Sequence, residues 1–194
     1  MKISYFGHSC FTIASEGFTI ALDPYDSSVP GYPPLALKAD MVCCSHGHFD
    51  HNYTQAVELS GTERSCPFTI SQIEIPHDKE GGAKRGMNFI RIFQAEGKKL
   101  IHFGDTGCMP GPDAIESLKG ADVAMVPVGS FFTIDAKEAK ELMEAIKPAI
   151  VIPMHYKKGT QGLPMIGTLD DFLEACKGSD LNIRPMEYGE ETEV

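Results

Sequence analysis

The chain carries the stretch Ser45-His46-Gly47-His48-Phe49-Asp50-His51 directly after a short apolar run, Met41–Cys44, that predicts a buried strand. Imidazole nitrogens and carboxylate oxygens are ligands that suit zinc, iron and manganese. His46 and His48 can both reach one ion from a loop, and Asp50 and His51 stand far enough along to reach a second. Because cysteine is absent from these positions, the stretch predicts an open site for water or substrate rather than a closed structural zinc site.

Ionisable side chains also follow four other predicted strands, at the point where each strand ends. They are Asp23, His77, Asp105 and His155. Strand ends on one side of a sheet meet in space, which is where sites are commonly built. These positions, together with the His-rich stretch, therefore predict one shared metal site. His8 and His102 fit the arrangement less well, and we expect them to be structural or to support the ligands.

The order of predicted elements indicates an α/β fold. Strands are expected at 2–6, 10–14, 18–22, 40–44, 68–75, 87–93, 99–103, 123–128, 149–154 and 182–186. Helices are expected at 53–59, at 112–118, from the N-cap Asp135 to a stop before Pro148, and from the N-cap Thr168 to about Cys176. Strands first, then strands alternating with helices, predict two sheets packed together with helices outside. We expect one domain over residues 1–194.

Composition limits the partners. The formal net charge of −10 leaves no basic surface to neutralise phosphates, so nucleic acid is not expected as a partner. A small anionic substrate stays compatible, because a bound metal can dominate the local field. The six cysteines show no CxxC pairing. We find no signal peptide or apolar run of membrane length, so a cytoplasmic protein without membrane association is expected.

The stretch His46–His51 resembles the HxHxDH signature of the metallo-β-lactamase superfamily, and four further segments match its motifs in the same order. These are Leu22-Asp23-Pro24, His77, Gly104-Asp105-Thr106-Gly107 and Met154-His155-Tyr156. Three stretches are similar to the branch with L-ascorbate-6-phosphate lactonase-like proteins: 2–9, 77–88 and 152–156. The resemblance implies the metallo-β-lactamase fold, a four-layer αββα sandwich of two mixed β-sheets.

The same resemblance implies a dinuclear metal site. His46, His48 and His77 would bind the first ion, Asp50, His51 and His155 the second, and Asp105 would bridge the two. Asp23 would orient the ligands from outside. We expect two divalent ions, with zinc first and manganese, iron or nickel as alternatives. The chain offers no room for the inserted nuclease domain or helical substrate domain of some relatives, which disfavours RNA processing and glutathione thioester chemistry.

The implied chemistry is hydrolysis. A hydroxide held between the ions would attack a carbonyl or phosphorus centre, and Asp50 is the candidate catalytic residue that orients it or moves a proton. Arg85 and Tyr156 are the candidate substrate contacts, and Phe131 and Phe132 either line the pocket or pack in the core. We expect a small, anionic ester, lactone or phosphodiester as substrate.

Two alternatives of another class stay open. One is a di-iron oxidoreductase, although its relatives typically carry a carboxylate in place of a first-cluster histidine and add a flavin domain. The other is a non-catalytic metal or ligand-binding protein of the same fold. β-Lactam hydrolysis is disfavoured because no export signal is found. A homo-oligomer is compatible with the sequence.

Overall fold

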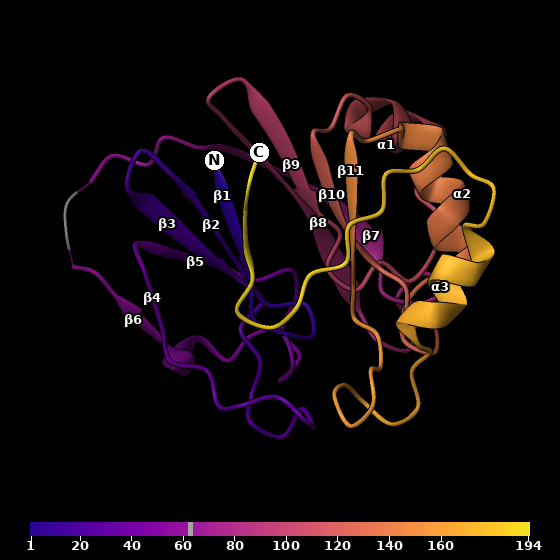
Figure 1. Cartoon of the computed structure of the whole chain (residues 1–194), viewed down its shortest axis with the longest axis horizontal. Coiled ribbons are helices and arrows are strands. Elements are labelled where there is room, and N and C mark those ends of the chain that lie inside the picture. Colours follow the sequence, from indigo (N-terminus) through magenta and orange to yellow (C-terminus); the bar gives the residue numbers. More distant parts are fainter. Residues whose placement is uncertain (62–63) are drawn as a thin grey trace.

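Two five-stranded β-sheets face each other in the computed structural model, which describes residues 1–61 and 64–194 (Figure 1). Both sheets are mixed. The first has the strand order β12 (Glu191–Glu193), β1 (Lys2–Tyr5), β2 (Phe11–Ser15), β3 (Phe18–Leu22) and β5 (Met41–Cys43). The second has the order β11 (Ile150–Met154), β10 (Val123–Pro127), β9 (Lys98–His102), β8 (Met87–Ala95) and β7 (Thr69–Pro76). The predicted two-sheet architecture is confirmed.

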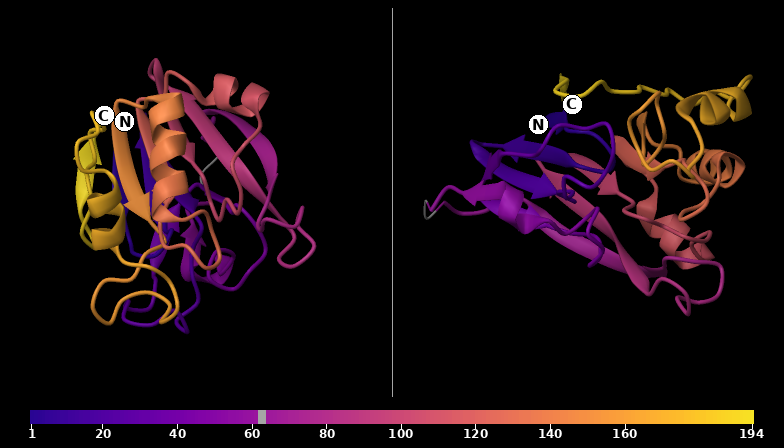
Figure 2. Two further views of the ribbon diagram at one scale, coloured as in Figure 1. Left: turned by 90° about the vertical axis from the view of Figure 1, so that its right-hand side faces the viewer. Right: turned by 90° about the horizontal axis from the view of Figure 1, so that it is seen from below.

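Three helices lie outside the second sheet, where Figures 1 and 2 show them side by side. They are α1 (Pro112–Leu118), α2 (Ala136–Ile146) and α3 (Leu169–Ala175). The predicted N-cap of α2 is present, because the Asp135 carboxylate accepts hydrogen bonds from the backbone N–H groups of Lys137 and Glu138. The apolar stripe of α2 is buried, as its helical spacing predicted; it consists of Ala139, Leu142, Met143 and Ile146.

The outer face of the first sheet is covered by a small parallel sheet instead of an α-helix. Strands β4 (Leu37–Ala39) and β6 (Val57–Leu59) form it, preceded by the 3₁₀ turn η1 (Thr54–Ala56). Their apolar side chains pack with Ala21 and Val42 of the first sheet. The helix predicted over 53–59 is therefore wrong: Thr54–Ala56 form a 3₁₀ turn, and Val57–Leu59 pair in parallel with Leu37–Ala39 as a strand. Within the described residues, α-helices cover one side of the sandwich only.

The C-terminal strand also differs from the expectation. Residues 182–186 contribute only an isolated bridge between Ile183 and Val151, because Pro185 lacks the N–H that a ladder needs. The final strand is β12, which pairs antiparallel with β1, so the two ends of the chain lie together (Figure 1). Among the described residues, no helix is long and apolar enough to cross a membrane.

In each sheet, several strands have their carboxyl ends on the same side. Strands β1, β3 and β5 run the same way in the first sheet, and β7, β9, β10 and β11 do so in the second. One continuous core of buried apolar side chains joins the two sheets, with Ile13 and Ile20 on one side and Ile90 and Leu100 on the other. The loops that leave the carboxyl ends of these strands therefore gather at one end of the sandwich.

Candidate metal centre

Every residue of the predicted metal site follows the carboxyl end of one of these strands. Asp23 follows β3, the HxHxDH segment follows β5, His77 follows β7, Asp105 follows β9, and His155 follows β11. The site thus draws side chains from both sheets. All of them are buried except His48, which is exposed, and His46, which is partly buried.

The donor atoms fall into three groups in which all atoms lie within 4.8 Å of one another. The first group is His46, His48 and His77; the second is His8, Asp50, His51 and His155; the third is His46, His51 and Asp105. The first group contains the residues predicted to bind the first ion, and the second contains those predicted to bind the second ion, together with His8. The third contains members of both, so the groups form one continuous cluster.

Asp105 lies at the centre of this cluster. Its Oδ1 is 3.1 Å from Nε2 of His51, and its Oδ2 is 3.2 Å from Nε2 of His155 and 3.4 Å from Nε2 of His77. The Nε2 atom of His46 is 4.0 Å from the same Oδ2. One carboxylate therefore faces imidazoles of both predicted ligand sets.

Several buried polar atoms of the cluster lack a hydrogen-bond partner among the described residues. They are Nε2 of His46, His51 and His155, Nδ1 of His8, His77 and His155, and Oδ1 of Asp105. Buried polar atoms are almost always paired, because an unpaired one loses its hydration without compensation. Open nitrogen and carboxylate atoms gathered in one buried cluster fit a divalent cation, so this cluster is capable of binding metal.

Charges within the cluster shift the pKa values of its own members. Burial opposes the charging of Asp105 and of His51, but their mutual attraction outweighs it. The charges of His155 and His51 hold the pKa of Asp105 well below its usual value, and the carboxylates of Asp105 and Asp23 raise the pKa of His51. Burial together with the charge of His51 lowers the pKa of His46 to about 3. A cation bound here would meet ionised carboxylates and a neutral His46, and its binding would be coupled to loss of a proton from His51.

Asp23 supports the cluster from the outer side. Its Oδ2 accepts a 2.7 Å hydrogen bond from Nδ1 of His51, and its Oδ1 accepts one of 2.6 Å from the backbone N–H of Ser45. The Ser45 hydroxyl also donates to Asp23. These bonds leave Nε2 of His51 directed at Asp105. His102 donates to the carbonyl of Ser9 and stays outside the three groups.

His8 is the residue that sequence reasoning placed outside the ligand set and the structure brings into the cluster. Its side chain is fully buried, and its Nε2 lies 3.1 Å from Oδ2 of Asp50. Its ring centroid is 4.3 Å from that of His155. The available signal was weak: His8 follows strand β1, but as a lone histidine after Gly7 it belongs to no local pattern.

The backbone is strained at three of these positions. His8, Asp23 and His155 have φ values of 54°, 43° and 53°, a region that residues other than glycine rarely occupy. Such conformations cost about 1–3 kcal/mol each and persist where surrounding structure enforces them. Here they turn the chain sharply at strand ends, so that His8 and His155 enter the cluster and Asp23 lies against His51.

Asn88 fixes the loop that carries Asp105. Its Nδ2 donates to the carbonyl of Phe103, and its Oδ1 accepts from the backbone N–H of Asp105. Gly104 lies so close that a Cβ there would stand 2.3 Å from Oδ1 of Asn88 and 2.4 Å from Cβ of Ser45. Gly104 is therefore required for the close approach of the two sheets at this point.

A hollow of about 370 Å³ opens over the cluster. Its floor is formed by His48, Asp50, His77 and Asp105, and its walls by Phe49, Arg85, Phe132, Leu163 and Met165. Of the two predicted substrate contacts, Arg85 lines this hollow. Tyr156 does not: its side chain is 3% exposed and packs in the main core, because it points inward where the neighbouring His155 enters the cluster.

Comparison with known proteins agrees with this architecture. The family described as "Beta-lactamase superfamily domain" matches residues 2–155. A protein named "UPF0173 metal-dependent hydrolase" from Thermoplasma acidophilum is 28% identical over 187 residues, covering 80% of this chain and 83% of that protein. A protein of the same name from Archaeoglobus fulgidus is 26% identical over 221 residues, covering 94% of each.

Solved structures match as well. A crystal structure from Thermotoga maritima, described as a candidate Zn-dependent hydrolase of the metallo-β-lactamase superfamily, has a TM-score of 0.73 and 31% identity. The match covers 96% of this chain and 98% of that one. The metallo hydrolase Igni18 from Ignicoccus hospitalis has the same fold, with a TM-score of 0.74 and 24% identity over 100% of this chain and 98% of its own.

The fold and the His/Asp cluster define a protein built like a metallohydrolase. The chain belongs to the metallo-β-lactamase superfamily and has its fold, as the HxHxDH segment predicted. The narrower resemblance to the L-ascorbate-6-phosphate lactonase-like branch stays a prediction.

Proposed function

We propose that this chain hydrolyses a small ester, lactone or phosphodiester at a dinuclear metal site. The coarser activity, that of a metal-dependent hydrolase, rests on membership of the superfamily and on relatives that carry this name. The substrate, the number of ions and their identity are the parts that we propose, with zinc as the expected metal.

In this proposal His46, His48 and His77 hold one ion, Asp50, His51 and His155 hold the other, and Asp105 joins the two. The observation that carries it is the position of Asp105, whose carboxylate oxygens lie 3.1–3.4 Å from imidazoles of both groups. When bound, the two ions supply a water of lowered pKa and polarise the oxygen of the substrate. The hydrogen bond that Nδ1 of His51 donates to Asp23 keeps His51 in the tautomer that presents Nε2 to the site.

Asp50 is the catalytic residue of this proposal. Its carboxylate lines the hollow, so a substrate and a water molecule can reach it. Burial opposes its ionisation, but the hydrogen bond from His8 and the charge of His51 outweigh burial and keep the pKa of Asp50 below its ordinary value. An ionised Asp50 would orient the attacking water by accepting a hydrogen bond from it, and it would pass the proton of this water to the leaving group only as the bond breaks.

Metal analysis of the purified protein tests the dinuclear site. We expect two divalent ions per chain in the wild type and fewer than one in Asp105→Asn, because this variant removes the central charge. Asp113→Asn, at an exposed position in the first turn of α1, is the matched control and should retain two ions. Two ions in Asp105→Asn, or one in the wild type, would contradict the proposal.

Activity is tested on a panel with one neutral ester, one lactone and one phosphodiester. The fully metallated Asp50→Ala variant should lose turnover by about 10²–10⁴-fold, the contribution typical of a positioned proton acceptor. Near-normal turnover in this variant would remove Asp50 from the mechanism. An iron-loaded wild type with a reducible signal and no hydrolysis would support the di-iron oxidoreductase instead, and a metallated protein silent on every substrate would support a binding protein.

A further inference from the structure

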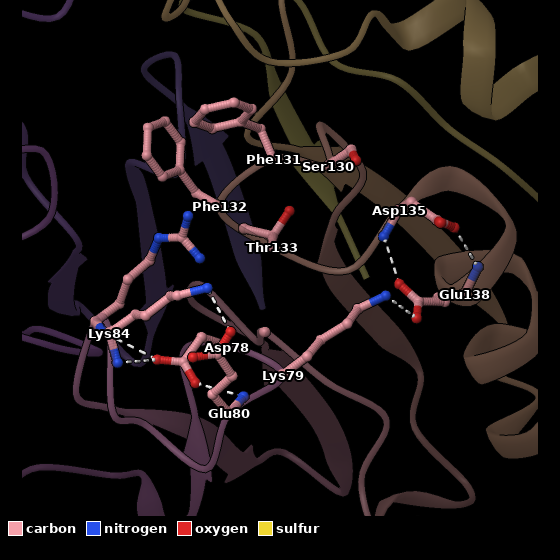
Figure 3. Close-up of a pocket in the computed structure, with 12 residues that line it drawn as sticks. Asp78, Lys79, Glu80, Lys84, Ser130, Phe131, Phe132, Thr133, Asp135 and Glu138 are labelled. Carbon is pink, nitrogen blue, oxygen red and sulfur yellow. Dashed lines mark hydrogen bonds and ion pairs between the residues drawn. The ribbon is translucent and has the colours of Figure 1, made fainter.

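A second hollow, of about 290 Å³, shares lining residues with the hollow over the metal cluster. Figure 3 shows the side chains that line this second hollow. It lies between the loop 78–85, which follows β7, and the segment 130–138, which leads into α2. Arg85 and Phe132 line both hollows, so they stand at the boundary. A molecule bound over the cluster therefore reaches Arg85 before it reaches the second hollow.

Arg85 is the basic side chain of this region that carries an uncompensated charge. Lys79 pairs with Glu138, as Figure 3 shows, and Lys84 pairs with Glu80. Within the described residues, the Arg85 guanidinium forms no ion pair. It lies instead over the ring of Phe132, 5.2 Å from the ring centroid. A planar guanidinium held on an aromatic face keeps its hydrogen-bond donors free for an anionic group.

The loop that carries Arg85 is held by one buried carboxylate. Asp78 is 3% exposed and accepts hydrogen bonds of 2.7–2.9 Å from four backbone N–H groups of its own loop. These groups belong to Glu80, Gly82, Lys84 and Arg85. The backbone N–H of His77 also donates to the carbonyl of Gly86, which closes the base of the loop. The position of Arg85 relative to the metal cluster is therefore set in advance, which lowers the entropic cost of binding.

The charges around Arg85 limit the anion that it can bind. The second hollow is lined by three basic side chains, Lys79, Lys84 and Arg85, and by four acidic ones, Asp78, Glu80, Asp135 and Glu138. A doubly charged phosphate monoester would meet more repulsion here than Arg85, the lining cation without an ion pair among the described residues, can offset. A singly charged carboxylate matches the Arg85 guanidinium in charge and in its two-oxygen geometry.

We propose that the substrate of this site carries a single carboxylate, which Arg85 binds, on an apolar body that rests against the walls of the first hollow. These walls are formed by Phe49, Phe132, Leu163 and Met165. The inference rests on the proposed hydrolase function, because the bond to be cleaved would lie over the His/Asp cluster. The substrate class is thus a small ester or lactone with an apolar body and one free carboxylate.

Three matched esters test the proposal in the metal-loaded protein. Mono-4-nitrophenyl glutarate carries a carboxylate, 4-nitrophenyl butyrate carries no charge, and a 4-nitrophenyl ester with a terminal phosphate carries two charges. We expect the wild type to prefer the glutarate ester by kcat/KM. Arg85→Gln should lower the ratio of glutarate to butyrate hydrolysis by about 10- to 100-fold, mainly through KM, because a charge-assisted hydrogen bond is lost.

Two variants control for charge and for the shape of the side chain. Lys84→Gln removes the same charge one residue away, where the ammonium group is already paired with Glu80, and should keep the wild-type ratio. Arg85→Lys keeps the charge but loses the planar fork and should give an intermediate ratio. An unchanged ratio in Arg85→Gln, or a preference for the phosphate ester, would overturn the proposal.

A binding measurement separates this proposal from the hydrolase function. Millimolar hexanoate should raise the thermal midpoint of the wild type and of Lys84→Gln more than that of Arg85→Gln, whereas hexanamide should not distinguish the three. Equal shifts from hexanoate in all three proteins would overturn the carboxylate site. An Arg85-dependent shift in a protein that cleaves no ester would retain the carboxylate site and reject the hydrolase function.

Discussion

The variant His8→Asn removes the imidazole that holds Asp50 and leaves the backbone conformation accessible. His8 has a φ of 54°, and asparagine adopts this left-handed region more readily than most residues. The asparagine side chain is shorter than histidine, so its amide cannot replace the 3.1 Å contact between Nε2 of His8 and Oδ2 of Asp50. Burial and the charge of His155 lower the pKa of His8 to about 4, so the exchange leaves the net charge at pH 7 unchanged.

The expected magnitude follows from the bond that is lost. A hydrogen bond to a charged group contributes about 1.5–3 kcal/mol, and both partners are buried here, so the free energy of unfolding should fall by about that amount. Residues that orient metal ligands typically change affinity by about 10- to 100-fold. We therefore expect His8→Asn to bind the second of the two proposed ions about 10- to 100-fold more weakly, with little change at the first.

Two measurements check this expectation. Titration against a chromophoric chelator gives the affinity of each ion, and urea unfolding of the metal-free protein gives the stability. His8→Gln, whose longer side chain keeps an N–H donor, should restore part of both quantities. If His8→Asn lowers stability but retains both affinities and the wild-type kcat, His8 is only a structural residue. If stability is also unchanged, the contact with Asp50 contributes nothing.

Three further predictions concern the surroundings of the cluster. In Gly107→Ala, the new Cβ would stand 2.2 Å from the backbone N of Asp78 and C of His77, so metal content should fall and stability should drop by about 1–3 kcal/mol. Gly111→Ala, whose Cβ meets nothing within 4 Å, should leave the metal content unchanged in the same metal analysis. Burial raises the pKa of Asp78, but its four backbone hydrogen bonds outweigh burial and lower this pKa to about 2. The contribution of Asp78 to stability is therefore complete above about pH 4 and is lost as the pH falls toward 2. In urea unfolding of the metal-free protein, Asp78→Asn should lose less stability than the wild type over that pH interval. Removing the metal with a chelator should lower the thermal midpoint by about 5–10 °C, since ligand at a hundred times its Kd stabilises by about 2.7 kcal/mol; an unchanged midpoint would mean that the folded state binds no ion tightly.

The candidate site could be predicted from the sequence as far as its members share a local pattern. His77, Asp105 and His155 each follow an apolar run that ends in a sharp turn, and this pattern can be recognised in the amino-acid sequence alone. His8 could not be assigned in this way, because its place in the cluster depends on β1 running in the same direction as β3 and β5. Tyr156 shows the opposite error, since a neighbour of a cluster residue in sequence turned out to point into the core.

The fold was predictable where helices and strands carry strong terminal signals. The capping residues Asp135 and Thr168 and the apolar spacing of α2 defined two helices correctly. Segment 53–59 carried no such cap: Tyr53 makes no side-chain hydrogen bond to the turn that follows. What covers the outer face of the first sheet depends on long-range pairing of β4 with β6, which no local propensity encodes.

The donors of the metal cluster are spread from His8 to His155, and they come from both sheets. A ribosome therefore releases the His46–His48 pair long before Asp105 and His155 exist to complete the arrangement. An ion that binds this early pair meets only half of its final neighbours, and the chain must keep folding around it or release it. Metal that arrives after both sheets have met finds a finished cluster, so loading the folded chain should yield more uniform protein than refolding it in the presence of metal.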